Sequence, residues 1–395
     1  MKRITLLLTL SLASLQPLLS QAFHFKSGFD GSTMLHQYEL NGNPNPNYAD
    51  LYGSDNGYDW ETDLDDHPNM GNFRIYYEVG DTLKAKASLV PDPVDGTNQV
   101  LKFQLDSANV SNISNPKGRV QAVINGNNNL KEFSHRVSLY LDPEIETLRN
   151  YGVKITWFTL AEYWNDAVSQ PYPFRVTLNL QKPDTAVGSP LFFGAHGQIK
   201  TSSGPWSDVW EHVDTTYEAP TGEWLVFETY FREGDSLNGR YRVSVTNSNN
   251  NTHSLIDITD FTHHPMDPSP DGVRNFNPMK LYTSGGLIDQ MALANADLAL
   301  YWDDFEIWTD TILLNTHIPF VPSPKIFPNP TSGSCQVHSE MPIKEVHLFN
   351  YAGKLERVYT LEEEEMDLSG LEKGIYFAEI FFWDGKREFT RVIRE

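Results

Sequence analysis

The sequence contains very little cysteine, since Cys335 is the only one in 395 residues. An internal disulfide and a cysteine-rich metal cluster are therefore excluded. The signatures of several enzyme classes are also missing: the sequence has no Gly-x-Ser-x-Gly, no His-Glu-x-x-His and no glycine-rich phosphate loop. Serine hydrolase, zinc protease and nucleotide chemistry consequently find no support in it.

Positive charge is scarce. The chain has 30 Lys and Arg against 52 Asp and Glu, which gives a formal net charge of -22. So acidic a surface repels nucleic acid and anionic membranes, and no nucleic-acid partner is expected. The same field disfavours a highly sulfated or polyuronate ligand unless a local basic groove overrides it. A calcium ion, by contrast, would suit this charge.

Long apolar runs are also rare, and the one that stands out is at the start of the chain. Lys2 and Arg3 precede an apolar run over 4–19, and small residues follow at positions 20 and 22. This pattern predicts a secretory signal peptide over the first 22 residues, with the mature chain beginning at Phe23. A membrane anchor is the alternative, but the run is shorter than the roughly 20 uninterrupted apolar residues that a span needs. No later segment predicts a transmembrane span.

Helical periodicity is almost absent from Phe23 to about Asp310. Short alternating or continuous apolar runs are separated by clusters of Asn, Gly, Pro and Asp, such as Asn41–Asn47 and Asn247–Asn251, which predict loops. This is an all-β pattern, and its strand number favours a two-sheet sandwich over a small barrel. The predicted strands are Val100–Leu105, Arg119–Ile124, Glu132–Tyr140, Gly152–Leu160, Phe174–Gln181, Trp224–Arg232, Arg240–Thr246, Met279–Thr283 and Leu298–Trp308.

Four prolines lie in the stretch Pro322–Pro330 and predict a linker, because proline cannot donate a backbone hydrogen bond. We therefore expect a cargo domain over 23–311, a linker over 312–325 and a second domain over 326–395. The second domain again shows short strand patterns, enough for a small sandwich. They are Cys335–His338, Glu345–Asn350, Leu355–Leu361, Gly374–Phe382 and Lys386–Ile393.

Several spaced motifs in the second domain carry a family resemblance. They are Ile326–Gly333, Val346–Tyr351, Asp367–Leu371 and Lys373–Phe377. Together they resemble the C-terminal sorting domain of the bacterial type IX secretion system, a small immunoglobulin-like β-sandwich. The resemblance implies the type IX machinery as a partner, removal of the module, and a protein that is secreted or attached to the outer cell surface. Glu395 is atypical as a last residue, and an immunoglobulin-like accessory domain without a sorting role stays open.

The cargo domain carries a second resemblance, on Gly118–Gln121, Phe133–Leu141, Ile155–Phe158 and Phe174–Leu178. These segments are similar to heparin-lyase-I-like polysaccharide lyases, which have a concanavalin-type jelly-roll fold. The resemblance implies that an Arg-x-Glu strand faces the glycan. In this sequence Gln121 stands where that glutamate would be, which removes one charge and one acid or base.

Lyase chemistry next to a uronate needs one group to neutralise the sugar carboxylate, a base for the C5 proton and an acid for the leaving oxygen. Strand alternation places Arg119 and Gln121 on one face, which suits a polar groove, although a solvated strand face gives the same pattern. The predicted catalytic residues are Arg119, Gln121, His196 and Tyr241, and Gln198 and Arg240 are predicted to bind substrate.

Aromatic residues are abundant, and sugar rings stack their C–H faces on aromatic planes. Trp206 and Trp210 flank a polar segment that the pattern assigns to a loop. We predict that both are glycan-binding platforms. The alternative is that they fix this loop to the core.

Acidic residues in the first and last cargo strands suggest a metal. Phe25–Asp30 and Tyr301–Trp308 are expected to pair, as in jelly rolls of this kind, and alternation puts Asp304 on the same face as Trp302. Calcium takes six to eight oxygen ligands, so Asp30 and Asp304 are its predicted ligands. The alternative is a solvated acidic edge that discourages strand pairing.

A retaining hydrolase would need alternating carboxylates with two glutamates on one strand, and the stretch Glu61–Asp65 lacks the second glutamate. The sequence therefore predicts a jelly-roll domain that binds or cleaves an extracellular polysaccharide, with a lyase favoured over a glycoside hydrolase. A non-catalytic surface adhesion or structural protein is the alternative.

Overall fold

The structure is a computed structural model with two compact units, 1–313 and 314–395. It describes residues 23–40, 42–67, 70–109, 116–127, 130–166, 170–200, 205–309, 325–339, 342–350, 353–360, 365–382 and 387–395. The predicted signal peptide lies outside these residues. Among them, no helix has the length and apolar character needed to cross a membrane.

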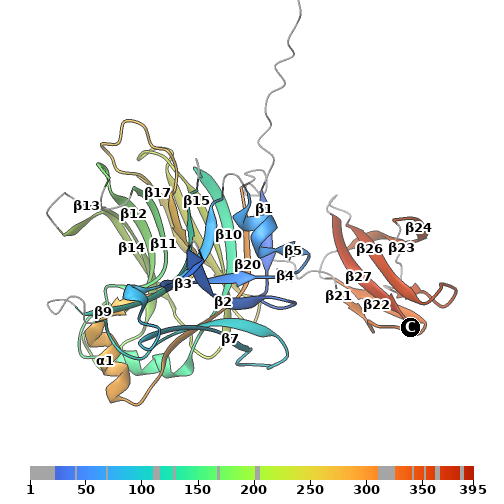
Figure 1. The fold of residues 1–395 in the computed structure, drawn as a ribbon, viewed down its shortest axis with the longest axis horizontal. Coiled ribbons are helices and arrows are strands. Elements are labelled where there is room, and N and C mark those ends of the chain that lie inside the picture. The colour runs from blue at the N-terminus through green and yellow to red at the C-terminus, as the bar shows by residue number, and fades with distance from the viewer. Residues whose placement is uncertain are drawn as a thin grey trace, which may run out of the picture. The chain divides into compact units, whose positions relative to one another are not determined.

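One sheet of the larger unit has eight strands, all antiparallel to their neighbours (Figure 1). Its order is β17 (Thr252–Thr259), β16 (Arg240–Thr246), β15 (Trp224–Arg232), β10 (Glu132–Leu141), β20 (Leu298–Trp308), β8 (Gln99–Leu105) and β7 (Ala85–Pro91), with β1 (His24–Ser27) beside β20. Phe25 of β1 lies opposite Ile307 of β20, so the predicted pairing of the first and last strands is confirmed.

The second sheet has ten strands. Its order is β14 (Trp206–Glu218), β13 (Phe192–Lys200), β12 (Phe174–Gln181), β11 (Phe158–Asp166), β18 (Asn275–Asn277), β9 (Lys117–Asn125), β6 (Asn72–Tyr77), β3 (Asn43–Tyr52) and β2 (Met34–Leu40), and β19 (Lys280–Ser284) pairs with β11 and β9. Shorter elements complete the unit: β4 (Ser54–Asp55), β5 (Tyr58–Asp59), a π-helical turn at Trp60–Asp65, 3-10 turns at Glu78–Gly80 and Pro143–Asn150, and helix α1 (Gly285–Leu293) beside β9.

The two sheets share one hydrophobic core, because alternate residues of each strand turn inward. Val120 and Ala122 of β9 are fully buried in the same core as Leu139 of β10. Burying a large apolar side chain in this way stabilises the fold by about 1.5–3 kcal/mol. The intervening residues of the ten-stranded sheet, such as Arg119 and Gln121, point away from the core. We call this outward surface the polar face. The all-β, jelly-roll-type sandwich predicted from the sequence is confirmed.

Three local predictions were wrong. The strand expected over Gly152–Leu160 begins only at Phe158, and the loop expected over Asn41–Asn47 belongs largely to β3. The segment with Trp206 and Trp210 is the start of β14 rather than a loop. Asparagine- and glycine-rich segments read as turns, but pairing with a neighbouring strand overrides such local preferences in a sheet.

The smaller unit is also a two-sheet sandwich. One sheet contains β21 (Lys325–Phe327), β22 (Ser334–His338) and β25 (Glu365–Asp367), and the other contains β24 (Leu355–Tyr359), β23 (Ile343–Asn350), β26 (Gly374–Phe382) and β27 (Arg387–Arg394). Its core is separate from that of the larger unit and includes Cys335, Val346, Leu348 and Ile380. The single cysteine is therefore a buried apolar side chain.

Candidate glycan-binding face

A buried ion network lies at the centre of the polar face. Lys280 of β19 forms an ion pair with Glu162 of β11, and Arg175 of β12 places Nη1 2.7 Å from the other oxygen of Glu162. The Lys280 and Glu162 side chains are 0% and 2% exposed. Burial alone would raise the pKa of Glu162, but Lys280 and Arg175 outweigh it and lower this pKa to about 2. Burial lowers the pKa of Lys280 to about 8, against the opposing effect of Glu162.

Arg119 lies between two tyrosine rings on the same face. Its guanidinium carbon is 4.9 Å from the centre of the Tyr76 ring and 5.3 Å from that of Tyr282. Glu78 forms an ion pair with the guanidinium, with its Oε2 2.6 Å from Arg119 Nε. The ammonium of Lys117 lies 5.4 Å from the Tyr282 ring. Arg119 is thus fixed in position, with an aromatic ring on either side.

Gln121 is adjacent to this arrangement but is nearly buried. Its side-chain amide donates to Asn277 Oδ1 at 2.5 Å, and its Cα lies opposite that of Lys280 on β19. A side-chain amide does not gain or lose a charge near neutral pH. Gln121 therefore fixes the position of its neighbours and does not serve as an acid or base.

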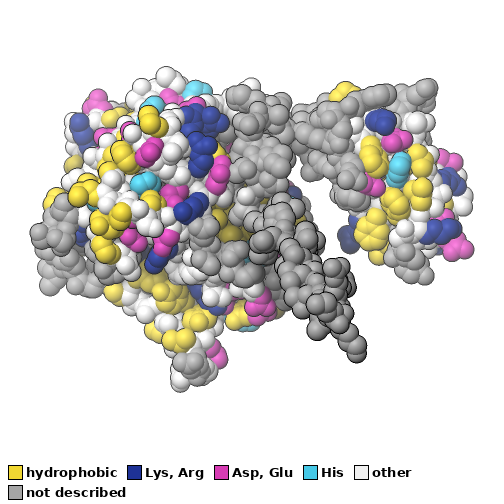
Figure 2. Space-filling view, turned by 90° about the horizontal axis from the view of Figure 1, so that it is seen from above, with side chains coloured by type: hydrophobic (Ala, Val, Ile, Leu, Met, Phe, Trp, Pro, Cys, Tyr) yellow, Lys and Arg dark blue, Asp and Glu magenta, His cyan; other side chains and the backbone are white. Residues whose placement is uncertain are grey.

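The part of the polar face around Arg119 and Lys280 carries a local surplus of positive charge. Lys117 and Arg119 share Glu78, and Lys280 and Arg175 share Glu162, so four cations meet two carboxylates. On the side of the larger unit drawn in Figure 2, Lys and Arg side chains lie among acidic and hydrophobic ones. A basic region can therefore exist on a protein whose overall charge is strongly negative.

Arg175 stacks on tryptophan next to the buried network. Its guanidinium carbon is 4.1 Å from the centre of the Trp206 ring and 5.6 Å from that of Trp164. Gln198 Oε1 accepts a hydrogen bond from Arg175 Nε at 2.8 Å. The predicted binding residues Trp206 and Gln198 therefore lie together on the polar face, around Arg175.

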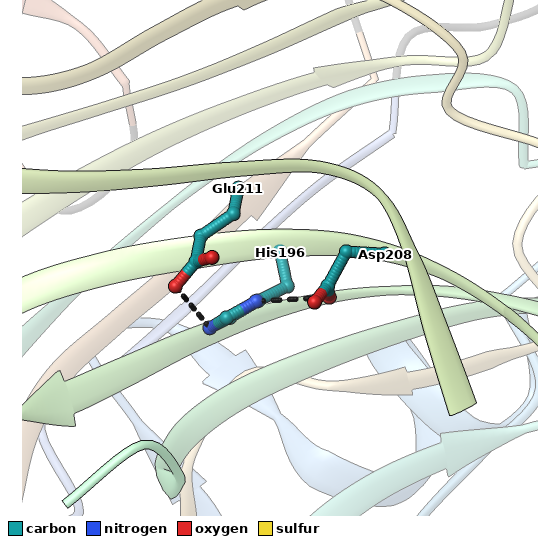
Figure 3. A group of neighbouring side chains, drawn as sticks. All are labelled: His196, Asp208 and Glu211. Carbon is teal, nitrogen blue, oxygen red and sulfur yellow. Dashed lines mark hydrogen bonds and ion pairs between the residues drawn. The ribbon is translucent and has the colours of Figure 1, made fainter. Parts of the chain in front are cut away.

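His196 forms a second polar centre with two carboxylates of β14 (Figure 3). Its Nδ1 is 3.0 Å from Asp208 Oδ1 and its Nε2 is 3.9 Å from Glu211 Oε1. Gln181 makes a 2.7 Å hydrogen bond to Nε2. One ring nitrogen of His196 and one oxygen of each carboxylate lie within 4.8 Å of one another, so these three side chains could together hold a metal ion.

The structure does not bring His196 and Arg119 into one centre. His196 lies on β13 and Arg119 on β9, with β12, β11 and β19 between them. Four strand spacings of about 4.8 Å separate the two strands by roughly 19 Å across the sheet. The predicted catalytic set therefore divides into two groups.

Two predicted residues lie in the core and cannot reach a ligand on the polar face. Tyr241 is 0% exposed and contacts the ring of Tyr163, and Trp210 donates from Nε1 to the backbone oxygen of Phe261 at 2.8 Å. Each occupies an inward position on its strand. Arg240 is on the outer surface of the eight-stranded sheet, where it pairs with Asp257.

The predicted calcium ligands do not share a site. Asp304 sits at a β-bulge with a positive φ of 49° and lies 3.4 Å from Ser138 Oγ, whereas Trp302 points into the core. The bulge breaks the alternation that placed Asp304 beside Trp302. Asp303, rather than Asp304, interacts with Asp30. Burial raises the pKa of Asp303 to about 8, and the negative charges of Asp304 and Asp30 add to this increase.

Sequence reasoning missed the central residues of the polar face. The strand Met279–Thr283 was predicted, and its alternation places Lys280 and Tyr282 on one face. That signal was available but points to no partner, because Glu162 is 118 positions away in the chain.

No curated protein sequence matches the chain. Its structure is similar to an endo-β-1,4-glucuronan lyase from the fungus Trichoderma reesei, at 10% identity and TM-score 0.38, over 60% of this chain and 90% of that one. It is also similar to the marine PL-14 alginate lyase from Aplysia kurodai, at 10% identity and TM-score 0.39, over the same two shares. The Ca²⁺/Man2-bound exoplasmic domain of VIP36 matches at 12% identity and TM-score 0.34, over 58% of this chain and 81% of that one. Likenesses this distant say nothing of activity.

The C-terminal unit has a direct match. Residues 325–392 match the family model of the secretion system C-terminal sorting domain. Together with the two-sheet fold of this unit, the match identifies it as the sorting domain of type IX export, so the protein is secreted or lies on the outer cell surface.

Proposed function

We propose that the larger unit binds an acidic extracellular polysaccharide on the polar face and cleaves it by β-elimination at Arg119. The observation that carries the proposal is the position of Arg119 between the rings of Tyr76 and Tyr282. An arginine flanked by two phenols supplies, in one place, the three groups that a uronate lyase requires.

The chemistry assigns one role to each group. Arg119 neutralises the uronate carboxylate, which makes the C5 proton easier to remove. One tyrosine, as the phenolate, takes the C5 proton while the C4–C5 double bond forms and the C4–O bond breaks. The other tyrosine protonates the leaving oxygen. The surplus positive charge around Arg119 and Lys280 would attract an acidic polymer against the overall negative charge of the protein.

The test incubates the mature protein with alginate, glucuronan and heparin-like polymers and follows the ultraviolet absorbance of the unsaturated product. Tyr282→Phe and Tyr76→Phe should each lower kcat by about 100-fold or more, because each removes one proton-transfer group. Tyr230→Phe, on the other sheet, is the matched control and should retain activity. If none of the polymers gives a rise in absorbance, the lyase proposal is wrong. Retention on glycan columns without product would favour the adhesion alternative.

We also propose a structural calcium ion at Asp30, Asp55 and Asp303. A Cβ placed on Gly28 would lie 3.4 Å from Asp55 Oδ2 and 3.5 Å from Asp303 Oδ1, so the two oxygens converge on one space. Asn98 adds Oδ1, a buried atom without a hydrogen-bond partner among the described residues. These four oxygens are of the type that calcium prefers and would supply part of its six to eight ligands. Calcium should raise the Tm of the unchanged protein but not that of Asp303→Asn. Asp304→Asn is the control, and calcium should raise its Tm as it does for the unchanged protein. Equal increases in all three proteins would refute this site.

For export, we propose that the first 22 residues and the sorting domain are both removed. A cargo domain over 23–311 would then act outside the cell. Mass spectrometry and N-terminal sequencing of the exported protein test this directly. An N-terminus other than Phe23, or an intact residue 395, would contradict one of the two cleavages.

A further inference from the structure

We infer that Arg175, Lys200 and Trp206 form a second anion-binding subsite of the polar face, which takes the acid group of another sugar in the same polymer. The inference rests on the proposed function, because it assigns a further part of the same glycan to the same face. It makes the ligand a chain with acid groups on several residues rather than a single acidic sugar.

Two neighbouring side chains fix the guanidinium of Arg175, and one of its nitrogens remains available to a ligand. Glu162 Oε1 and Gln198 Oε1 fix its Nη1 and Nε at 2.7 Å and 2.8 Å. Over the part of the chain that the structure describes, Nη2 makes no hydrogen bond, and the side chain is 17% exposed. A guanidinium fixed in this way loses little entropy when it binds a carboxylate.

Trp206 adds a surface that suits a sugar ring. Its indole lies against Arg175, and the ammonium of Lys200 is 5.7 Å from the ring centre. A pyranose can stack its C–H face on such an indole while its acid group meets the two cations. The single carboxylate of Glu162 is shared by Arg175 and Lys280. It therefore balances only one of these two positive charges.

Arg119 and the subsite lie on strands that are not neighbours in the sheet. Arg119 is on β9 and Arg175 on β12, with β19 and β11 between them. Three strand spacings place the two strands roughly 14 Å apart across the sheet. A ligand that uses both arginines must therefore carry acid groups on different sugars, and its affinity must increase with chain length.

Calorimetry with uronate oligosaccharides of increasing length tests the inference. The measurements use the full chain carrying Tyr282→Phe, so that the oligosaccharides are not cleaved. Arg175→Ala should weaken the binding of long oligosaccharides by about 10-fold or more, the scale of a lost charge-assisted hydrogen bond, and leave disaccharide binding unchanged. Arg119→Ala should weaken both. Arg136→Ala, on the outer surface of the other sheet, is the matched control.

The outcomes separate the two proposals. If the parent protein binds oligosaccharides and Arg175→Ala binds every length equally well, the subsite is refuted and the proposed function stands. If the parent protein binds no acidic oligosaccharide of any length, the proposed function fails, and the subsite fails with it. Should Arg175→Ala not fold, Trp206→Ala replaces it, because that change leaves the pair between Arg175 and Glu162 intact; the same length dependence is expected.

Discussion

Glu162 shows how much of the candidate site depends on a single buried charge. Its carboxylate is almost fully removed from water and is stabilised by Lys280 and Arg175. Transfer of a carboxylate into the interior is costly, and the cost is offset only while both partners remain in place. The same pair fixes β11, β19 and β12 relative to one another, and therefore positions the side chains on either side of it.

The first prediction concerns this carboxylate and pH. The pKa of Glu162 is about 2 in the folded protein, below its ordinary value of 4.5. The lowered pKa stabilises the fold above pH 4.5, and this contribution is lost as the pH falls from about 4.5 to about 2. Glu162→Gln should cost about 3–5 kcal/mol at pH 7, because it leaves Lys280 buried without its partner. The difference from the parent protein should shrink below pH 4.5.

Urea unfolding of the two proteins at several pH values checks this. The matched control is Glu228→Gln, which breaks the pair of Glu228 with Arg136 at a partly exposed position. Exposed pairs contribute about 0–1 kcal/mol, so this variant should remain close to the parent protein. A Glu162→Gln variant as stable as the control would show that the buried network does not hold the face together.

Some residues of the site followed from the sequence and others did not, for a physical reason. Alternation along one strand is a local property, and it was sufficient to place Arg119 and Gln121 on the same face. Inward and outward aromatic residues look alike in a sequence, so Tyr241 and Trp210 were assigned to a groove although they lie in the core. Ion pairs such as that of Glu162 with Lys280 depend on strand order, which no local pattern contains.

Strands in the middle of the two sheets were the most predictable elements. Phe174–Gln181 and Trp224–Arg232 match β12 and β15 residue for residue, because their apolar runs end at clear turn signals. Irregular elements were not predictable in the same way. The bulge at Asp304 shifts every residue after it by one position, which is why a period of two assigned Asp304 to the wrong neighbours.

A prediction at this scale concerns Gly197 of β13, which leaves room for the indole of Trp210. A Cβ at this position would lie 2.3 Å from the indole of Trp210. Gly197→Ala must therefore push Trp210 out of place and should destabilise the larger unit by about 1–3 kcal/mol. Thermal unfolding measures this. Gly152→Ala is the matched control, because a Cβ there meets nothing within 4 Å. Equal Tm values for the two variants would show that the contact is not tight.

At the scale of the whole molecule, the chain consists of two units with separate hydrophobic cores. Among the described residues, each core consists of side chains from its own unit, so we expect each unit to fold when the other is missing. The motifs in the second unit were recognisable from the sequence because turn residues and a buried strand recur at fixed spacings. The function of the first unit was harder to predict, because its site is assembled from strands distant in the chain.

Separate cores and a sorting domain together predict the effect of truncation. Deletion of residues 325–395 should leave the Tm of the larger unit within about 1 °C of its value in the full chain, because the core residues described for that unit all precede residue 308. Export should stop, because the sorting domain is what the secretion machinery recognises. Cell fractionation of a bacterium with type IX secretion, together with circular dichroism of the purified fragment, measures both effects.

As a control, residues 325–395 fused to an unrelated periplasmic reporter should carry it to the outside. A truncated protein that is folded and still exported would show that the address lies elsewhere in the chain, whereas an unfolded one would show that the two units depend on each other.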